Sequence, residues 1–240
     1  MITYAYRDPD LQYDEFLALE SACFVTDHGQ TTSPELFQKR LTRMFWTARD
    51  ESGAVVGFVQ SKRSGNALFL SNMAVAPAYR RQGISSHLLK LAEEHARSLG
   101  CARLELGVLA NNAPALGAYL KFGFTQRGPA EHRYEFDLPL WYESRLPEVD
   151  RMDGVETILF MIDGKCVGDT QLNDALGCRE LTLSDPSRDL LGAISAVAKQ
   201  MRPDAKSMGI MTAEANVIAE FERMGFTPES VHLTMTKDLA

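Results

Sequence analysis

The chain has 240 residues, of which 45% are hydrophobic and 24% charged, a composition typical of globular proteins and unlike that of disordered, collagen-like or coiled-coil chains. At roughly 150 residues per domain, this length predicts one large domain or two small ones. The net charge of −7, all of which falls in residues 140–240, argues against a general binder of nucleic acid.

The first part of the chain alternates between strand and helix patterns. Turn-forming residues, helical spacing of apolar side chains and helix-capping residues set the boundaries. In chain order, the predicted elements are a strand at 2–7, helices at 10–23 and 33–43, strands at 44–49, 55–62 and 67–75, a helix at 84–99, a strand at 103–108, a helix at 113–122, and a closing strand pair at 124–126 and 132–138.

The second part of the chain partly repeats this pattern after a predicted linker at 140–150. Residues 163–168 resemble residues 52–57, and Gly225-Phe226 resembles Gly123-Phe124. A matched order of elements supports a degenerate internal repeat, and chance matching of a few glycines is the alternative. We therefore predict a first domain at 1–139 and a second, smaller copy at 151–240.

The sequence also bears on location and on cysteine chemistry. No apolar run approaches the roughly 20 residues that span a bilayer, and the first ten residues lack the apolar core of a signal peptide. We expect a cytoplasmic protein without a membrane partner. Cys23, Cys101, Cys166 and Cys178 are widely spaced, so we expect small buried apolar residues rather than metal ligands or disulfides.

The strongest local feature is a strand that leads through a turn into a helix, at residues 75–86, VAPAYRRQGISS. The first N–H groups of a helix have no partner inside it, and together with the helix dipole they form an anion site. Gly83 allows a ligand to approach the backbone closely, and Arg80 and Arg81 add positive charge. A diphosphate would fit here, and a plain helix start with surface arginines is the alternative.

A second feature follows some 30 residues later. Asn112, Ala115 and Tyr119 are spaced three and four residues apart, which places them along one face of a helix. Gly123-Phe124 comes directly after that helix. Taken alone, this block could be a helix cap and core packing.

The two blocks together resemble the GNAT family of acetyl-CoA-dependent N-acetyltransferases, over about residues 1–139. The Q/R-x-x-G-x-G/A signature of the family is present as Arg80-x-x-Gly83-x-Ser85, with Ser85 where Gly or Ala is usual. The N-x-x-A-x-x-x-Y-x-x-x-G-F block is complete. The resemblance implies an α/β fold with a mixed sheet, acetyl-CoA as co-substrate and no metal.

The resemblance also implies roles for individual residues. Backbone N–H groups of residues 81–86 would hold the CoA pyrophosphate. Main-chain groups of Met73 and Val75 would pair with the pantetheine arm where strands 67–75 and 103–108 splay apart. Tyr119, whose hydroxyl is protonated at neutral pH, would act as general acid towards the CoA thiolate. The implied cofactor-binding residues are Met73, Ala74, Val75, Arg80, Arg81, Gln82, Gly83, Ile84, Ser85, Ser86, Asn112, Ala115 and Tyr119.

The general base is less clearly marked. Relatives that acetylate ribosomal protein N-termini carry a Glu where this chain has Gly107. The nearest carboxylate on that strand is Glu105, on the same side of the strand, and a solvent-facing strand carboxylate is the alternative reading. Asp27, His28, which can titrate near neutral pH, and a water chain are the other candidates.

The second copy lacks these residues. Tyr119 aligns with Phe221, Asn112 with Glu214, Arg80 with Asp189 and Ser85 with Ile194, so we predict a GNAT-like domain without a cofactor site.

The expected activity of the whole chain is acetyl transfer by direct attack in a ternary complex. The acceptor would be a primary amine, either a small molecule or a protein N-terminus, and homodimer formation stays open. A non-catalytic acyl-CoA-binding or regulatory pseudoenzyme, or transfer of a larger acyl group, are the alternatives.

Overall fold

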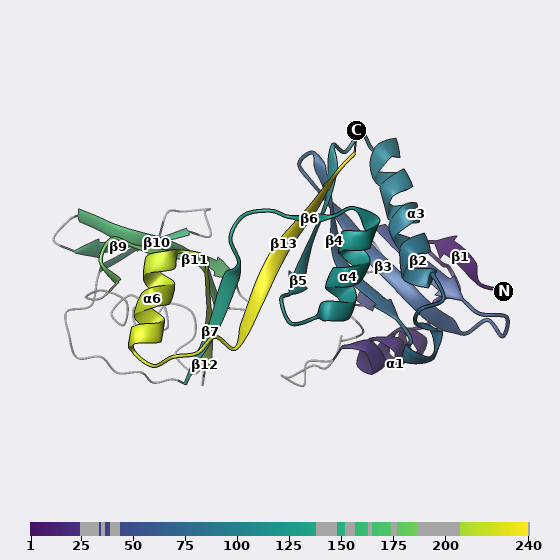
Figure 1. Ribbon diagram of the computed structural model, residues 1–240, viewed down its shortest axis with the longest axis horizontal. Coiled ribbons are helices and arrows are strands. Elements are labelled where there is room, and N and C mark those ends of the chain that lie inside the picture. Colours follow the sequence, from purple (N-terminus) through teal and green to yellow (C-terminus); the bar gives the residue numbers. More distant parts are fainter. Residues whose placement is uncertain are drawn as a thin grey trace. The chain divides into compact units, whose positions relative to one another are not determined.

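The structure is a computed structural model, which describes residues 1–24, 34, 37–38, 44–137, 148–151, 157–162, 165–173, 177–186 and 207–239. The helices are α1 (Tyr13–Cys23), the short 3-10 helix η1 (Pro77–Tyr79), α3 (Ile84–Ser98), α4 (Ala113–Phe122) and α6 (Ala215–Arg223) (Figure 1). The strands are β1 (Thr3–Tyr6), β2 (Met44–Arg49), β3 (Val55–Ser64), β4 (Ala67–Val75), β5 (Arg103–Leu109), β6 (Thr125–Gln126), β7 (Glu131–Asp137), β8 (Glu148–Arg151), β9 (Thr157–Ile162), β10 (Lys165–Asn173), β11 (Gly177–Leu183), β12 (Ser207–Thr212) and β13 (Ser230–Asp238). Most of the predicted helix at 33–43 lies outside the described residues.

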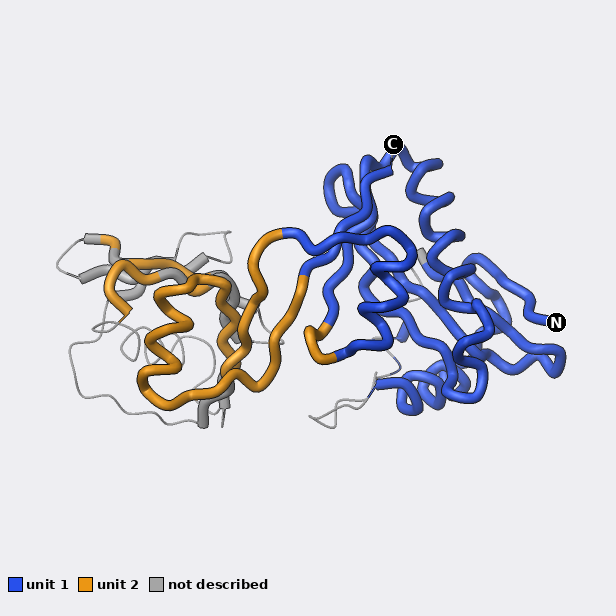
Figure 2. Tube along the Cα trace, in the orientation of Figure 1, with its two compact units in different colours: residues 1–108, 112–127, 234–240 blue, residues 109–111, 128–233 orange. Residues whose placement is uncertain are grey.

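The chain forms two compact units (Figure 2). Unit 1 contains residues 1–108, 112–127 and 234–240, and unit 2 contains residues 109–111 and 128–233. In unit 1 the strands run in the order β1-β2-β3-β4-β5, followed by β13, which also pairs with β6. Strands β1 to β4 are antiparallel, and β5 is parallel to β4. This is the mixed α/β sheet that the sequence predicts.

Helices cover the two faces of the unit 1 sheet. On one face, Phe16 of α1 packs with Phe58 of β3 and Ala74 of β4 in an aromatic-rich core cluster. On the other face, a Cβ atom added at Gly57 of β3 would lie 3.2 Å from Ile84 of α3. Glycine at this position therefore lets α3 lie close against the sheet. Helix α4 packs beside α3.

Unit 2 repeats the order of elements found in unit 1. Its strands β9-β10-β11-β12 and helix α6 correspond to β2-β3-β4-β5 and α4. The ends of the two helices match closely. Gly123 and Gly225 both have positive φ, +96° and +84°, and the ring preceding each glycine by four residues makes an edge contact with the phenylalanine that follows it, in the pairs Tyr119–Phe124 and Phe221–Phe226.

The closing strands of the two units are exchanged along the chain. Strand β7 follows α4 but pairs with β12, with Tyr134 opposite Ile210. Strand β13 follows α6, and its second half pairs with β6, with Thr236 opposite Thr125. The predicted closing pair of residues 124–126 with 132–138 is therefore wrong. The division into units also differs from a boundary at 139, because residues 128–137 belong to unit 2 and 234–240 to unit 1.

Within the part of the chain that the structure describes, no helix combines the length and apolar character needed to cross a membrane.

The cysteines differ from the sequence prediction in one respect. Cys101 is buried and Cys23 half-buried, but Cys166 is exposed. The prediction of a buried Cys166 is therefore wrong, and its thiol contacts the carbonyl of Gly168 in its own strand.

The exchange makes the fold of unit 1 depend on the C-terminus. Thr236 Oγ1 donates to the carbonyl of Leu104 at 3.2 Å, and Lys237 Nζ donates to Glu93 of α3 at 2.6 Å. We predict that a chain ending at residue 229 loses the cooperative unfolding transition of unit 1, because β5 and β6 lose their neighbouring strand. Calorimetry of that chain beside full-length protein tests this, with the volume-conserving Met235→Leu variant as control. A truncated chain that melts within a few degrees of the full chain would contradict it.

Candidate active site

The site is centred on a gap between β4 and β5. The two strands pair in parallel from Ala67 and Arg103 up to Leu70 and Leu106, although both continue beyond this point. At the same place β4 carries a bulge: Leu70 lies opposite Ser61 of β3 and Asn72 opposite Gln60, which leaves Ser71 as the additional residue. Bulges of this kind bend a strand and are frequent beside active sites.

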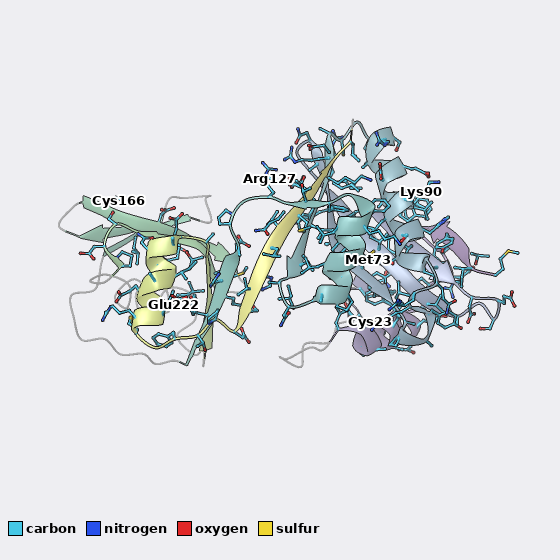
Figure 3. The ribbon with its side chains drawn as sticks, in the orientation of Figure 1. Cys23, Met73, Lys90, Arg127, Cys166 and Glu222 are labelled. Atoms are coloured by element: carbon cyan, nitrogen blue, oxygen red, sulfur yellow. The ribbon has the colours of Figure 1, made fainter. Side chains whose placement is uncertain are left out.

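The backbone of β4 beyond the bulge presents hydrogen-bonding groups to this gap. The N–H of Ala76 donates to Val56 O of β3 at 2.9 Å. Because successive N–H groups of an extended strand point to opposite sides, those of Val75 and Met73 point away from β3. Met73 is labelled in Figure 3, together with Cys23 at the end of α1, whose thiol donates to Val75 O at 3.4 Å.

The turn after β4 has a backbone geometry that could bind an anion. Arg81 and Gly83 both adopt positive φ, +64° and +85°, and alternating backbone conformations of this kind collect N–H groups into a concave nest. Gly83 is the N-cap of α3, which has no side-chain cap, and the first bond within the helix runs from His87 N to Gly83 O. The N–H groups of the first turn are therefore available to an anion. A Cβ atom at Gly83 would meet no atom within 4 Å, so positive φ, not lack of space, favours glycine here.

The side chain of Arg80 is not simply a free positive charge beside the turn, as the sequence alone suggests. Arg80 is exposed, but its Nε donates to Val75 O at 3.1 Å, so its side chain folds back on the end of β4. Ile84 is buried against the sheet, while Gln82 and Ser86 are exposed and Ser85 is half-buried.

A hydrogen bond to a residue outside the predicted site ties the turn after β4 to the β2–β3 turn. The Tyr79 hydroxyl of η1 donates to Asp50 Oδ2 at 2.5 Å, and the other oxygen of Asp50 accepts bonds from Ser52 and Ala54 in the β2–β3 turn. Hydrogen bonds from Ser52 and Tyr79 lower the pKa of Asp50 to about 2. The Asp50–Gly53 turn joins β2 to β3, and no local pattern in the sequence shows that Tyr79 would reach it.

Helix α4 supplies the second predicted block. Asn112 is its N-cap and accepts a hydrogen bond from Ala115 N at 3.2 Å. Tyr119 is buried, 9% exposed, and burial raises its pKa to about 12. Its hydroxyl therefore keeps its proton at neutral pH, as the sequence analysis expects.

The predicted base lies in an ion-pair cluster. Glu105 Oε1 accepts from Arg103 Nε at 2.6 Å and from Arg127, labelled in Figure 3, at 2.7 Å. Glu105 lies opposite Phe69 of β4, and Gly107 beyond it is exposed. Asp27 and His28 lie outside the described residues. Within the ranges that the structure covers, no group of three or more His, Cys, Asp or Glu side chains could hold a metal ion.

Known acetyltransferases resemble this chain in sequence over the part that contains the site. The model of the acetyltransferase (GNAT) family matches residues 13–124. An aminoglycoside N(6′)-acetyltransferase type 1 from Klebsiella aerogenes is 40% identical over 63 residues, which are 26% of this chain and 41% of that protein. Acetyltransferase Atu2258 of Agrobacterium fabrum is 31% identical over 99 residues, which are 41% of this chain and 71% of that protein. The chain thus spans less than half of the first relative and over two thirds of the second.

A solved structure extends the likeness beyond the matched stretch. A tandem GNAT protein from the clavulanic acid biosynthesis pathway aligns with 99% of this chain and 98% of its own, at a TM-score of 0.65 and 16% identity. At this identity the likeness shows a shared fold alone.

The Asp50–Tyr79 tie predicts a pH dependence of stability. Because the pKa of Asp50 is lowered in the folded protein, its contribution is fully present above the ordinary value near 4 and is lost as the pH falls to about 2. Asp50→Asn should therefore lower the free energy of unfolding at pH 5 to 7, and the difference from wild type should shrink towards pH 2. Urea denaturation across this range measures it, with Glu94→Gln in an exposed ion pair as control. A difference that stays constant down to the lowest pH would contradict the assignment.

Proposed function

The chain belongs to the GNAT family of acetyltransferases, and we propose that it transfers the acetyl group of acetyl-CoA to a primary amine by direct attack in a ternary complex. The observation that carries the proposal is the alignment of three features of unit 1. The backbone nest at Arg81–Gly83, the outward-facing main chain of Met73 and Val75, and the gap after Leu70 follow one another along β4 and its turn. A diphosphate, an amide-bearing arm and a reactive thioester would fit these features in that order.

Binding is proposed to follow this order. The N–H groups of residues 81–86 would hold the diphosphate. The main chain of Met73 and Val75 would pair with the amide groups of the pantetheine arm, in the manner of an added strand. Arg80 can release Val75 O, because its side chain is exposed. Asn112 acts on the site indirectly, since its side chain caps α4.

The chemistry then needs an oxyanion donor and a general acid. The neutral amine nitrogen attacks the acetyl carbon, and the carbonyl oxygen takes up negative charge that an outward-facing backbone N–H near Val75, such as that of Met73, would stabilise. The carbon–sulfur bond then breaks, and the sulfur leaves as a thiolate. Tyr119 donates its proton to that sulfur, and the pKa of about 12 ensures that it holds the proton beforehand. The proton that the nitrogen loses as the amide forms would leave through a chain of water molecules and in the end replace the proton given up by Tyr119.

Glu105 is the carboxylate that the sequence suggests as general base, and we propose that it serves the fold instead. Its Oε1 accepts two charged hydrogen bonds, from strand β5 itself through Arg103 and from Arg127 just after β6. Charge-assisted bonds of this kind are strong and directional. They join the strand that borders the gap to the segment that closes the sheet.

We further propose that unit 2 is a degenerate copy without a cofactor site. Gly57 lies opposite Val75 in unit 1, and Gly168 lies opposite Leu183 in unit 2, so Leu183 corresponds to Val75 and Leu181 to Met73. In unit 2 these two carbonyls accept hydrogen bonds from Asn216 Nδ2 at 3.1 Å and from Thr212 Oγ1 at 3.0 Å. The buried Thr212 hydroxyl thus occupies a carbonyl that a pantetheine arm would use, whereas Asn216 is exposed, as Arg80 is in unit 1.

The residues at the end of β12 and in α6 also differ from their counterparts in unit 1, and these differences too disfavour a cofactor site. The residues that correspond to Thr212 and Asn216 in the first copy are Ala110 and Pro114, which have no side-chain donor. Phe221 replaces Tyr119 and lacks its hydroxyl. Glu214, the N-cap of α6, forms no side-chain cap bond, in contrast to Asn112. Each change removes one requirement for binding or chemistry.

The acceptor is proposed as a small-molecule amine or a protein N-terminus, in keeping with a relative whose name gives an aminoglycoside as its acceptor. Transfer of a larger acyl group and a binding role without catalysis are the remaining alternatives, and the titration below separates the binding role from acetyl transfer.

Tyr119→Phe tests the general acid. We predict that it lowers kcat by about 10²- to 10⁴-fold, the range for loss of an acid catalyst, with little change in the Kd of acetyl-CoA. Because the pKa of Tyr119 is raised, loss of its acid form would affect the wild-type rate only as the pH approaches about 12. Glu105→Gln is the matched comparison and should lower kcat less than about tenfold. A Glu105→Gln effect as large as that of Tyr119→Phe would restore Glu105 as the base.

Calorimetric titration with acetyl-CoA tests the single cofactor site. We predict one site per chain, retained in Tyr119→Phe and lost in Gly83→Glu, which brings a carboxylate and a side chain at positive φ to the anion site. In the second copy Gly192 aligns with Gly83 as Asp189 does with Arg80, and the equivalent change Gly192→Glu should leave the stoichiometry unchanged. Two sites per chain would contradict the degenerate copy, and binding without turnover of any amine would favour the non-catalytic role.

A further inference from the structure

A pair of amide side chains lies on the sheet of unit 1 at the point where β4 and β5 part. Gln60 of β3 and Asn72 of β4 stand directly opposite each other, and Asn72 Nδ2 donates to Gln60 Oε1 at 3.2 Å. Gln60 is fully buried, 0% exposed, while Asn72 is half-buried. The pair follows immediately on the bulge at Ser71.

The pair has more donors than it uses. Among the described residues, Gln60 Nε2 is buried without a hydrogen-bond partner, and Asn72 Nδ2 has a second hydrogen beyond the one it gives to Gln60. A buried amide group without a partner lowers stability, because it has lost its water and gained nothing in return. Native proteins contain few such groups, and each calls for a reason.

The position of the pair relative to the proposed reaction is well defined. Asn72 comes directly before Met73, about 10 Å along the strand from Val75, and follows the last β4–β5 pair, Leu70 and Leu106. An arm that runs from the nest of α3 back along β4 therefore brings its thioester end towards Asn72.

The register of β3 and β4 also shows on which face of the sheet the amide pair lies. Phe58 and Ala74 lie opposite each other on the α1 face, and Gln60, two residues after Phe58, shares that face. The amide pair thus lies on the face opposite α3, whose N-terminus would hold the diphosphate, and an acceptor that meets the thioester beside this pair would approach from the α1 face.

We propose that Asn72, with its amide oriented by Gln60, donates a hydrogen bond to an oxygen of the acceptor, and that the enzyme therefore selects amines that carry a hydroxyl or carbonyl oxygen close to the nitrogen. The inference rests on the proposed acetyl transfer. Asn72 contacts the acceptor, and Gln60 is a positioning residue behind it. Surplus donors match an oxygen rather than a second ammonium group, so plain alkylamines gain nothing from the pair.

The test compares amines of matched size with and without such an oxygen. Acetylation of glucosamine and of glycinamide is measured beside that of cyclohexylamine and of propylamine, in wild type, Gln60→Met, Gln60→Glu and the control Ser61→Ala. Ser61 is a buried polar neighbour on the opposite face of β3. The two oxygen-bearing amines separate hydroxyl from carbonyl recognition.

Gln60→Met removes the acceptor that orients Asn72 and is expected to raise KM for an oxygen-bearing amine about five- to tenfold, the value of one hydrogen bond. KM for acetyl-CoA and the rates with cyclohexylamine and propylamine should stay unchanged. Its melting temperature should equal or exceed that of wild type, since an unpaired buried donor has been removed. Gln60→Glu keeps an oxygen for Asn72 and should recover most of the KM, and Ser61→Ala should leave KM unaffected.

The possible results distinguish the role of the Gln60–Asn72 pair from acetyl transfer itself. If wild type acetylates the amines but prefers none that carries oxygen, or if Gln60→Met raises KM equally for all four, the role of the pair is overturned while acetyl transfer stands. If Gln60→Met lowers the melting temperature and leaves every KM unchanged, Gln60 is only part of the core and the inference fails. If wild type acetylates none of the amines although it binds acetyl-CoA, the proposed function fails, and the inference fails with it.

Discussion

The parting of β4 from β5 after Leu70 and Leu106 is the constraint on which the site depends. A parallel pair normally satisfies the backbone of both strands along their whole length. Where the strands separate, β4 keeps β3 on one side, and its other side presents N–H and C=O groups that only a ligand, water or a side chain can satisfy. The bulge at Ser71 falls at the same place, so the bend of β4 and the opening of the sheet have a common local origin.

The two units show two ways of meeting this constraint. In unit 2, buried Thr212 and the nearby Asn216 supply donors to the carbonyls of β11. In unit 1, the corresponding residues cannot donate, and Val75 O accepts from the exposed Arg80 and from Cys23. An exposed arginine can turn into solvent at little cost, whereas removal of a buried hydroxyl donor leaves a buried carbonyl unpaired. The same element order is thus compatible with a carbonyl that an exposed side chain can release in unit 1 and with one held by a buried hydroxyl in unit 2.

Sequence could predict the features that depend on local chemistry. The helix start at Gly83, and the cap formed by Asn112 together with the core packing of Tyr119, follow from these residues and their immediate neighbours. Partners distant in sequence could not be predicted in the same way. A run of β-forming residues indicates a strand but does not name its neighbour, which is why the exchange of β7 and β13 was missed. The ties of Glu105 to Arg127 and of Asp50 to Tyr79 were missed for the same reason.

The charge counted from the sequence also differs from the charge that a ligand would meet at the site. The formal count of residues 1–139 is neutral, but the structure pairs many of these charges with each other. Asp8 and Glu15 hold Arg49, Glu93 holds Arg97 and Lys237, and Glu105 holds two arginines. Charges used in this way hold elements together and contribute little net field to a ligand. In the function that we propose, recognition of the diphosphate therefore rests on backbone N–H groups, and recognition of the acceptor on neutral amides such as Asn72. Both are groups whose orientation the fold fixes before a ligand arrives, which is the condition for a preorganised site.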